Sequence, residues 1–473
     1  MIANHKLYPA MKDSGVEWLG QVPEHWQLRR LKTGIANVVD QTPDRTEDDS
    51  YIALEHVEPW TGRIRDASPG TAFDSQVKRF RAGDVLFGKL RPYLAKVARP
   101  ANRGVCVGEF LVLRPREGNR STAYLEQFLR SKPLIDVINA STFGAKMPRA
   151  NWAFIGNLDQ LIPPLAEQEG IVRFIDYVDR RIRRYIRAKQ KLIKLLEEQK
   201  QAIIHRAVTR GLPAAAATQA GLDPDVPLKG SGVEWLGQVP EHWEVVRSRR
   251  LFSARKGLAL PDDVQLSATQ AYGVIPQAEF ESRVGRRVTK VFMHLDKRKH
   301  VEEDDFVMSM RSFQGGLERA WASGAIRSSY VILKPNERVD VGFFMYLFKS
   351  RGYIGALQAT ANFIRDGQDL TERNFRQVDL PCPPLEEQTE IASHISDTCV
   401  RIQSDVTRAN REIELLNEYR TRLIADVVTG KLDVREAAAS LPDDAEELEA
   451  MDDLLPELDE TDLGEIPEVE PDE

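Results

Sequence analysis

Residues 83–89 read GDVLFGK and match the pattern G-x-x-x-x-G-K, which begins the phosphate-binding loop of many nucleotide-binding proteins. That loop also needs a serine or threonine directly after the lysine, because the hydroxyl holds the Mg²⁺ ion of the nucleotide. The next residue here is Leu90, and the second half of the chain has no matching glycine and lysine. We therefore do not expect this pattern to bind a nucleotide.

Two proline pairs are the nearest approach to a methyl-transfer site. A DNA methylase carries a polar residue, two prolines and an aromatic residue in its catalytic loop, but residues 162–165 read IPPL and residues 382–385 read CPPL. Residues 198–200 form an E-x-K triplet that falls on the surface of an expected helix, where such charges are ordinary. No two histidines have metal-ligand spacing with a third ligand nearby. The sequence therefore predicts a chain without catalytic residues and without a metal site.

Basic and amide side chains are better suited to binding than to catalysis. Arginine and lysine contact phosphates and guanine edges, and asparagine and glutamine can read adenine through two hydrogen bonds. Any one of these residues is more often a solvated surface residue, but clusters at matching places in both halves of the chain favour a nucleic-acid surface. The candidate DNA-binding residues are Lys78, Arg79, Lys89, Arg91, Tyr93, Lys146, Arg149, Asn151, Arg286, Arg287, Arg311, Gln314, Arg365 and Gln368.

The charge of the chain is unevenly distributed. The net charge is −7, but residues 441–473 contain 16 acidic residues and no lysine or arginine. The remaining 440 residues carry 65 basic against 56 acidic side chains, a mildly basic balance that suits a nucleic-acid partner. The acidic end has too few apolar residues to bury a face, so we expect it to be disordered. It could solubilise the chain or compete with DNA for the basic surface.

The three cysteines and the hydropathy pattern indicate the cellular compartment of the protein. Cys106, Cys382 and Cys399 are odd in number and lack metal-ligand spacing, so we expect reduced thiols. No apolar run approaches the roughly 20 residues that a membrane span needs, and the N-terminus has no apolar signal segment. These features indicate a cytoplasmic protein.

A repeat organises the whole chain. The phrase SGVEWLGQVPEHW occurs at residues 14–26 and again, without a change, at residues 231–243. Further matches follow at a nearly constant offset, such as PPLAEQ at 163–168 with PPLEEQ at 383–388. The chain is thus one unit of roughly 220 residues written twice, which is far longer than the repeats of about 20–50 residues that build solenoids. Two similar domains related by a pseudo-twofold axis are expected.

Each repeat changes character at its proline pair. Before it, short apolar segments alternate with glycine, proline and aspartate turns, which indicates a mixed α/β domain. After it, residues 165–209 contain no proline and one glycine, and apolar residues recur at spacings of four and three, which is typical of a coiled coil. A helix of some 45 residues is about 67 Å long, so it needs a partner outside its own domain. The predicted apolar stripe is Ile171, Ile175, Val178, Ile182, Tyr185, Leu192, Leu196 and Ile203.

These patterns define the expected fold. It is an α+β fold in which two similar mixed α/β globular domains are joined by two long helices forming an antiparallel coiled coil, with a pseudo-twofold internal repeat and a disordered acidic C-terminal tail. The second helix supplies the partner that the first one needs. Because one repeat begins with the phrase and the other ends with a helix, the two ends of the chain can meet.

The order of these motifs resembles the specificity subunit of type I restriction–modification systems over residues 8–435. The resemblance rests on the combination of the W-L-G-x-x-P-x-x-W phrase with P-P-L-x-E-Q, both given twice. It implies a prokaryotic, cytoplasmic DNA-binding subunit that is not itself an enzyme. Each globular domain would be a target recognition domain that reads one half of a split, asymmetric DNA sequence, and the helices would set the gap between the half-sites.

The resemblance also implies the partners and cofactors of the chain. The partners would be double-stranded DNA, two methylase subunits docked on the helix pair, and restriction (translocase–nuclease) subunits. The chain would hold no cofactor, while S-adenosylmethionine, ATP and Mg²⁺ would be bound by the partner subunits. The expected divisions of the chain are an N-terminal joint segment (1–26), target recognition domain 1 (27–162), spacer helix 1 (163–210), a linker with the repeated joint (211–243), target recognition domain 2 (244–382), spacer helix 2 (383–430) and an acidic disordered tail (431–473).

The repeated phrase itself is interpreted as structural. If it read DNA, two identical copies could not help to recognise two different half-sites. We therefore predict that four tryptophans are apolar joints that seat each domain on the helices. They are Trp18, Trp26, Trp235 and Trp243.

Three other classes of function stay open at this level. The first is a specificity subunit of a related restriction type whose partner fuses cutting and methylation. The second is a coiled-coil scaffold that binds proteins and no DNA, for which DNA binding would be absent or insensitive to salt. The third is a self-contained nuclease or methylase, which would need the catalytic motifs that the sequence lacks.

Overall fold

The computed structural model describes residues 6–43, 49–65, 76–116, 121–144, 147–285, 297–309, 312–360 and 370–441. Contacts between residues divide the chain into two compact units. Unit 1 comprises Met1–Lys189 and Asn410–Glu457, and unit 2 comprises Gln190–Ala409 and Leu458–Glu473. The first globular domain therefore shares a unit with the end of the second long helix, and the second domain with the end of the first.

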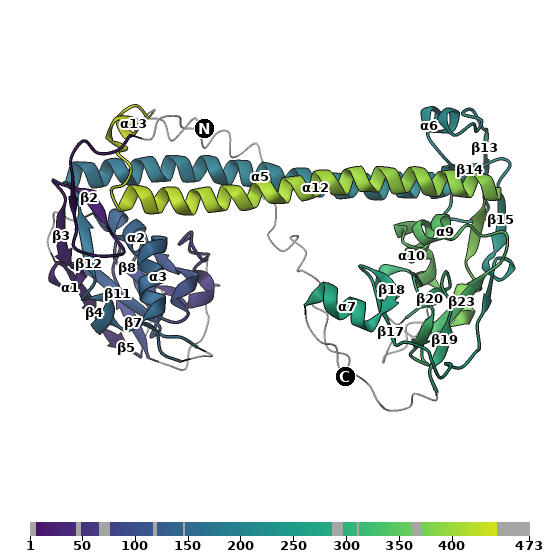
Figure 1. Ribbon diagram of the computed structural model, residues 1–473, viewed down its shortest axis with the longest axis horizontal. Helices are drawn as coiled ribbons and strands as arrows, with labels where there is room; N and C mark the ends of the chain where they lie inside the picture. The colour runs from purple at the N-terminus through teal and green to yellow at the C-terminus, as the bar shows by residue number, and fades with distance from the viewer. Residues whose placement is uncertain are drawn as a thin grey trace. The chain divides into compact units, whose positions relative to one another are not determined.

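Unit 1 contains two four-stranded sheets among its described residues (Figure 1). Their buried positions are occupied mainly by valine, leucine and phenylalanine side chains. The first sheet has the order β4 (Ile35–Val38), β11 (Phe110–Pro115), β8 (Val85–Gly88) and β9 (Val97–Ala98), and all its pairs are antiparallel. The second has the order β5 (Gln41–Thr42), β7 (Val77–Phe80), β10 (Gly104–Val107) and β6 (Ser50–Ile52), with β10 and β6 parallel.

Short elements complete unit 1. Two further antiparallel pairs are β1 (Met11–Asp13) with β2 (Gln21–Pro23), and β3 (Gln27–Arg30) with β12 (Asp159–Ile162). The helices are α1 (Leu31–Gly34), α2 (Thr122–Arg130), α3 (Lys132–Ala140), α4 (Trp152–Ile155) and α13 (Arg435–Ala439), with 3₁₀ turns at Leu54–His56 and Pro92–Leu94.

Unit 2 repeats this plan, but its described strands form one four-stranded sheet and four two-stranded pairs. Its four-stranded antiparallel sheet has the order β16 (Phe252–Ala254), β23 (Val331–Pro335), β20 (Phe306–Met308) and β21 (Glu318–Arg319). The antiparallel pairs are β13 (Leu228–Gly230) with β14 (Gln238–Pro240), β15 (Glu244–Arg247) with β24 (Asp379–Cys382), β17 (Leu266–Thr269) with β18 (Gly273–Pro276), and β19 (Lys299–Val301) with β22 (Gly324–Ile326). The helices are α6 (Ala214–Gln219), α7 (Gln277–Val284), α8 (Ser312–Gly315), α9 (Val341–Phe348), α10 (Arg351–Ala359) and α11 (Glu372–Phe375), with a 3₁₀ turn at Ser248–Arg250.

Two long helices run through the units. They are α5 (Leu165–Arg210, 46 residues) and α12 (Leu385–Val428, 44 residues). In unit 1, Asp179 of α5 pairs with Arg420 of α12, and Lys189 of α5 pairs with Glu412. The residue number rises in one helix as it falls in the other, so the helices are antiparallel. The predicted fold class, with two mixed domains and a pair of long antiparallel helices, is confirmed.

The apolar stripe of α5 is confirmed at its start and shifts along its length. Ile171, Ile175, Val178 and Ile182 are buried, whereas Tyr185 and Leu192 are 56% and 42% exposed. Towards the end of the helix, Ile204 rather than Ile203 is buried. An α-helix turns once in 3.6 residues, so a stripe assigned with a strict repeat of 3.5 drifts by about 20° per heptad. This drift explains why the later positions were wrong.

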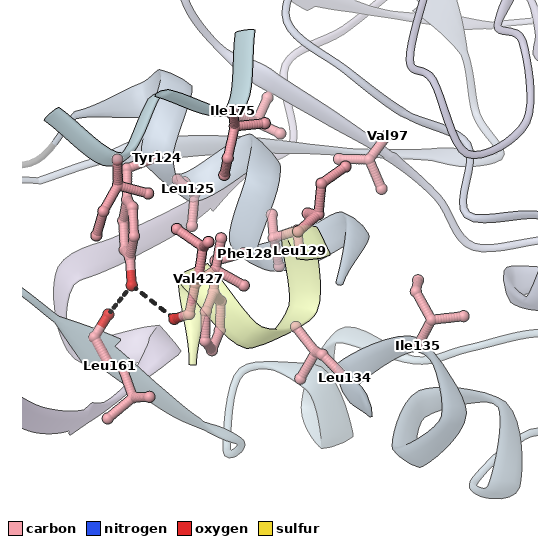
Figure 2. Close-up of a cluster of buried hydrophobic side chains, with 14 of the residues drawn as sticks. Val97, Tyr124, Leu125, Phe128, Leu129, Leu134, Ile135, Leu161, Ile175 and Val427 are labelled. Carbon is pink, nitrogen blue, oxygen red and sulfur yellow. Dashed lines mark hydrogen bonds between the residues drawn. The ribbon is translucent and has the colours of Figure 1, made fainter. Parts of the chain in front are cut away.

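The core of unit 1 joins its globular domain to both long helices. Figure 2 shows Tyr124 and Phe128 of α2 close to Ile175 of α5 and Val427 of α12. The Tyr124 hydroxyl donates to the backbone oxygen of Leu161 (3.2 Å) and lies 3.1 Å from that of Val428. Ser121 starts α2 as its N-cap, where its Oγ accepts from the Tyr124 N–H (3.2 Å) and satisfies one of the free donors of the first turn. The domain is therefore packed on the helices through a continuous apolar core.

The first residues of the predicted disordered tail are ordered. Val434 and Ala438 are buried, and α13 packs on the start of α5, where a side chain added to Gly170 would contact Ala438. This segment also meets the beginning of the chain, because the Asp433 N–H donates to the Lys6 backbone oxygen (2.8 Å). Residues 431–441 thus belong to unit 1, because their apolar side chains are part of its core. The remaining tail, 442–473, lies outside the described residues.

No helix in the described part of the chain is both long enough and apolar enough to cross a membrane.

Candidate nucleic-acid surface and the two joints

In unit 1 the repeated phrase binds the proline–glutamate motif that begins α5. Glu167, from the sequence PPLAEQ, is a buried carboxylate. Trp26 Nε1 donates to Glu167 Oε1 (3.1 Å), and His25 Nε2 lies 2.9 Å from Glu167 Oε2. The Tyr8 hydroxyl donates to Glu167 Oε1 as well (2.6 Å). Burial and then this hydrogen bond raise the pKa of the Tyr8 phenol, so the group stays protonated and keeps its donor.

Unit 2 has the same arrangement at the start of α12. Trp243 Nε1 donates to Glu387 Oε1 (3.0 Å), and His242 Nε2 lies 2.6 Å from Glu387 Oε2. Glu387 is the glutamate of PPLEEQ and is also buried. We call these two arrangements the first joint (His25, Trp26, Glu167) and the second joint (His242, Trp243, Glu387). The two motifs that recur in the sequence therefore recur because they bind each other.

Each joint also contacts the end of the other long helix. Gly430, just after α12, has a positive φ of 74°, and a side chain there would collide with Pro23 and Trp26. Gly211, just after α5, has a φ of 78°, and a side chain there would touch the ring of Trp243. Both glycines close their helix in the left-handed conformation that few other residues adopt without strain. The first joint thus lies between the start of α5 and the end of α12, and the second between the start of α12 and the end of α5.

The four tryptophans differ in burial. Trp26 and Trp243 are 1% and 0% exposed, whereas Trp18 and Trp235 are only half-buried. Trp18 packs on Phe128 with 6.3 Å between the ring centroids, and Trp235 packs on Tyr353 with 6.0 Å. The inner tryptophan of each phrase therefore anchors the joint, and the outer one packs against the helices of the adjacent globular domain.

A pair of glutamines adds contacts that sequence reasoning missed. Gln168 Oε1 accepts from the Ser121 N–H (3.0 Å), and Gln388 Oε1 accepts from the Asp340 N–H (2.8 Å). Ser121 and Asp340 are the N-caps of α2 and α9. Each glutamine thus ties the start of a long helix to the N-terminus of a helix in the adjacent domain, α2 or α9. The sequence did hold a signal for these glutamines, because both copies of the proline motif end in Glu-Gln.

Two of the candidate DNA-binding residues have structural roles. Lys78 on β7 is 7% exposed, and its Nζ donates to the backbone oxygens of Phe110 (2.7 Å) and Gly108 (3.1 Å). Desolvation by burial lowers the pKa of Lys78. The expectation that Lys78 contacts DNA is corrected, because its ammonium group is directed into the domain. Asn151 is exposed but caps α4, with its Oδ1 accepting from the Ala153 N–H (2.9 Å).

The other described candidates of unit 1 include one compact group. A β-bridge pairs Leu90 with Arg149, and the Arg91 N–H donates to the Pro148 backbone oxygen (2.8 Å). This pairing brings Lys89, Arg91 and Tyr93 to the side of the loop that carries Arg149. We call these four residues the unit 1 basic surface. Arg79 lies on β7, where its guanidinium donates to Thr42 Oγ1 (3.2 Å).

The unit 1 basic surface has the character of a ligand-binding face. Arg91 and Tyr93 are exposed, and Arg91 makes no side-chain hydrogen bond or ion pair with any described residue. Arg149 donates to Glu109 Oε1 (3.1 Å), and Lys89 Nζ lies 4.0 Å from Glu109 Oε2. Half-exposed pairs of this kind contribute little to stability, so a phosphate can replace Glu109 as the partner of Arg149 at small cost. Two large apolar side chains in the same loop are also exposed, Phe143 (79%) and Met147 (54%).

The candidates of unit 2 are not located. Arg286, Arg287, Arg311, Arg365 and Gln368 lie outside the described residues, as does Lys146 of unit 1, and the side chain of Gln314 in α8 is not described.

Unit 2 does show one exposed cation–aromatic pair that sequence reasoning missed. The guanidinium of Arg319 lies 4.2 Å from the ring centroid of Trp321, whose side chain is 46% exposed. Arg319 also donates to Asp304 Oδ1 (2.6 Å). An exposed ring stacked on a guanidinium can pack on a base or a sugar. The sequence did hold a signal for this pair: Arg319 and Trp321 are two positions apart at the end of a strand, and such a spacing places both side chains on the same face.

The described residues contain no group of three or more histidine, cysteine, aspartate or glutamate side chains that could hold a metal ion.

The chain is similar to known proteins over most of its length. No family model matches the chain. The sequence is 22% identical over 440 residues to the putative type I restriction enzyme MjaX specificity subunit of Methanocaldococcus jannaschii, which covers 88% of this chain and 96% of that protein. It is 24% identical over 181 residues to the type I restriction enzyme EcoDI specificity subunit of Escherichia coli, covering 37% of this chain and 40% of that protein.

The predicted resemblance to type I specificity subunits is confirmed. The fold is shared with a solved chain from a structural study of complex assembly and conformational transition of the type I R-M system. That chain superposes with a TM-score of 0.63 at 18% identity, covering 87% of this chain and 99% of the other. The HsdS subunit from Thermoanaerobacter tengcongensis is also similar, with a TM-score of 0.47 at 18% identity and 88% and 98% coverage. The match to the MjaX subunit therefore includes both repeats, whereas the match to the EcoDI subunit covers only part of the chain.

Proposed function

We propose that this chain is the DNA-binding specificity subunit of a type I restriction–modification complex, in which each globular domain reads one half of a bipartite, asymmetric DNA target. The observation that carries the proposal is the pair of joints. The same three side chains, histidine, tryptophan and glutamate, hold each domain to the long helices. The domains that they hold have different sequences. Two identical joints that hold two different domains suit a protein that places both domains on the helices in the same way but reads a different half-site with each.

The unit 1 basic surface supports DNA as the ligand. Its arginines can contact phosphates or guanine edges, and Tyr93 offers an exposed ring beside them. A protein-binding scaffold would not need exposed arginines grouped in this way. The salt dependence of DNA affinity distinguishes a DNA-binding subunit from a protein-binding scaffold, because DNA binding through phosphates weakens steeply as the salt concentration rises. A specificity subunit of a restriction type with a fused cutting–methylating partner would show the same surface.

The long helices support two further roles. Both α5 and α12 contribute residues to unit 1 and to unit 2, so their length can set the spacing between the two half-sites. They also expose large apolar side chains, which on a surface favour contact with other proteins. We propose that two methylase subunits dock on the helix pair and that restriction subunits complete the complex. The exposed large apolar residues are Leu165, Tyr185, Leu415 and Tyr419 in unit 1, and Leu192, Leu195, Leu385 and Val400 in unit 2.

The chain is proposed to be non-catalytic. The nucleotide and methylase motifs are incomplete in the sequence. In this account S-adenosylmethionine, ATP and Mg²⁺ act on the partner subunits, and this chain selects the DNA sequence.

Lengthening both helices tests the spacing role. Four residues inserted after Gln190 in α5, with four inserted after Ala409 in α12, extend the helix pair by about 6 Å at ~1.5 Å per residue. One base-pair step is ~3.4 Å, so we expect the unread gap to grow by about two base pairs while both half-sites stay the same. Genome-wide mapping of methylated adenine reads half-sites and gap together. A changed half-site with an unchanged gap would contradict the proposed role of the helices.

Arg91→Ala tests the unit 1 basic surface. The substitution removes an exposed guanidinium without removing an internal contact, so the stability of the chain should not change. If Arg91 contacts a phosphate, the slope of log affinity against log salt falls by about one, and if it reads a base, affinity falls by about 1–3 kcal/mol.

Two controls accompany the measurement of DNA binding by the complex with its methylase partners. Arg411→Ala removes an exposed arginine of α12, which pairs with Glu414, and should leave DNA affinity unchanged. Lys78→Ala should lower stability rather than affinity, because Lys78 binds two backbone oxygens inside the domain. Equal DNA affinity of the Arg91→Ala and Arg411→Ala variants at all salt concentrations would remove Arg91 from the proposed interface.

A further inference from the structure

A pocket of about 430 Å³ opens beside the second joint, within unit 2. Its wall includes His242 and Glu387, the two joint residues that bind each other, and two further acidic side chains stand around it. Its wall is therefore part acidic and part apolar, and it includes the buried carboxylate of the joint. The lining residues are Leu222, Asp223, Val226, Pro227, Glu241, His242 and Glu387.

In unit 1 the same place is filled by Tyr8. The ring of Tyr8 lies 5.6 Å from that of Trp26 and 5.8 Å from that of His25, between centroids, and its side chain is 4% exposed. Its hydroxyl donates to Glu167 Oε1 (2.6 Å). The guanidinium of Arg435 covers the outside of the ring, 5.1 Å from its centroid. The first joint is therefore closed by an aromatic side chain that donates a hydrogen bond, with a cation above it.

The segment before the second joint corresponds residue by residue to the segment before the first joint, which carries Tyr8. Met11 pairs with Pro23 between β1 and β2, and Leu228 pairs with Pro240 between β13 and β14, so the same offset of 217 relates both partners. At this offset the counterpart of Tyr8 is Asp225, which is exposed and whose N–H donates to Asp223 Oδ1 in a local turn (2.9 Å). The segment that corresponds to Arg435 is the alanine run of α6. No tyrosine, arginine or lysine is among the described residues that line the pocket at the second joint.

This chain has no tyrosine of its own for the pocket. All 11 tyrosines lie in the described part of the sequence, and none lines the pocket. The acidic end, 442–473, contains no tyrosine and would be repelled by Asp223, Glu241 and Glu387. A second copy of the chain offers Tyr8 only by opening its own first joint, where that side chain is buried. A second copy also exposes Tyr93, Tyr185 and Tyr419, so self-association is an outcome that the test below separates from a different partner. Because this chain has no tyrosine at the pocket, the phenol would come from another polypeptide.

We propose that the pocket at the second joint binds a tyrosine side chain of a partner polypeptide, whose hydroxyl donates to Glu387 as Tyr8 donates to Glu167. Asp223 and Glu241 at the pocket favour a basic residue next to that tyrosine, in the role that Arg435 has in unit 1. This protein-binding site is separate from DNA recognition. Its occupant is defined by one feature, an exposed tyrosine next to a basic residue.

The test is titration of the full chain with N-acetyl-tyrosinamide, followed by NMR of the tryptophan indole N–H groups. The Trp243 signal, identified from a Trp243→Phe variant, reports the pocket because its N–H donates to Glu387. We expect this signal to shift on addition of the probe. N-acetyl-phenylalaninamide lacks the hydroxyl that would donate to the carboxylate, so it should bind on the order of tenfold more weakly.

Two variants at one position complete the test. Asp225→Tyr supplies the phenol from the chain itself, as in unit 1, and should abolish the shift caused by the probe. Asp225→Ala is the matched control and should bind the probe as the unaltered chain does. Equal binding of the two amides, or binding that persists in Asp225→Tyr, would overturn the proposal. A concentration-dependent dimer in analytical ultracentrifugation that only Asp225→Tyr abolishes would assign the pocket to a second copy and also overturn it.

Discussion

Trp26→Ala is expected to lower the free energy of unfolding of unit 1 by about 3–5 kcal/mol, the range for removing a large aromatic side chain from a core. Trp26 is 1% exposed and packs against Pro23, Tyr8 and the end of α12. The substitution opens a cavity at that place and removes the donor to Glu167. Urea unfolding of the full chain, followed by circular dichroism, measures the loss.

Two comparisons make this prediction specific to the joint. Trp243→Ala should cost a similar amount in unit 2, because Trp243 is equally buried and has the same partner in Glu387. Trp18→Ala should cost less, because Trp18 is only half-buried. None of the three should change the DNA sequence that is methylated in cells in which the complex still assembles. A relaxed methylation motif in Trp26→Ala, with normal stability, would show that the phrase reads DNA.

Arg420→Ala is expected to destabilise unit 1 by up to about 3 kcal/mol, because it removes the partner on the other helix from a largely buried carboxylate, which then keeps only Arg183 of its own helix. The Arg420 guanidinium on α12 pairs with Asp179 on α5, and the two side chains are 9% and 16% exposed. Asp176 lies close to Asp179, and burial and then the charge of Asp179 raise the pKa of Asp176. Without Arg420, Asp179 keeps only its pair with Arg183 (2.9 Å), next to the Asp176 carboxyl.

The pH dependence of this loss has a definite sign. A carboxyl whose folded pKa is raised is destabilising in its charged form, and protonation relieves that cost as the pH falls through the raised pKa. The deficit of Arg420→Ala should therefore be largest near neutral pH and should shrink as the pH falls through the raised pKa of Asp176. Unfolding of both chains in urea at several pH values measures it.

Arg411→Ala is the matched control, since it also removes an arginine from α12 in unit 1. Its ion pair with Glu414 is exposed, with both side chains at 65%, so the expected cost is at most about 1 kcal/mol. Asp179→Ala combined with Arg420→Ala should recover part of the loss, because the largely buried charge of Asp179 is then absent. If Arg420→Ala costs no more than Arg411→Ala, the buried pair does not hold the two helices together.

The architecture could be predicted from the sequence because its signals are long and repeated. A stretch of 45 residues without proline and with one glycine leaves few alternatives to a helix, and its length requires a partner outside its own domain. The strict heptad assignment failed from the middle of α5 onwards, where Tyr185 and Leu192 are exposed and Ile204 rather than Ile203 is buried. Residues 431–441 were assigned to the acidic tail because composition was averaged over the whole end of the chain, although Val434 and Ala438 are core residues.

The candidate site was harder to predict, because exposure depends on contacts between distant segments. Lys78 and Arg91 look alike in the sequence, yet Lys78 is bound by backbone oxygens of residues 108 and 110, and Arg91 faces outwards. Glu167 looks like an ordinary charged residue of a helix start, but it binds Tyr8 and Trp26 from more than 140 positions away. No local pattern encodes such partners, and only the duplication of the two motifs pointed to them.

Genome-wide mapping of methylated adenine in cells with and without this gene tests the central claim most directly. The account predicts one asymmetric motif of two short half-sites separated by a fixed unread gap, present with the gene and absent without it. Replacing residues 244–382 by the corresponding domain of a relative should change one half-site and leave the other unchanged. An unbroken motif, or a methylation pattern that does not depend on the gene, would contradict the account.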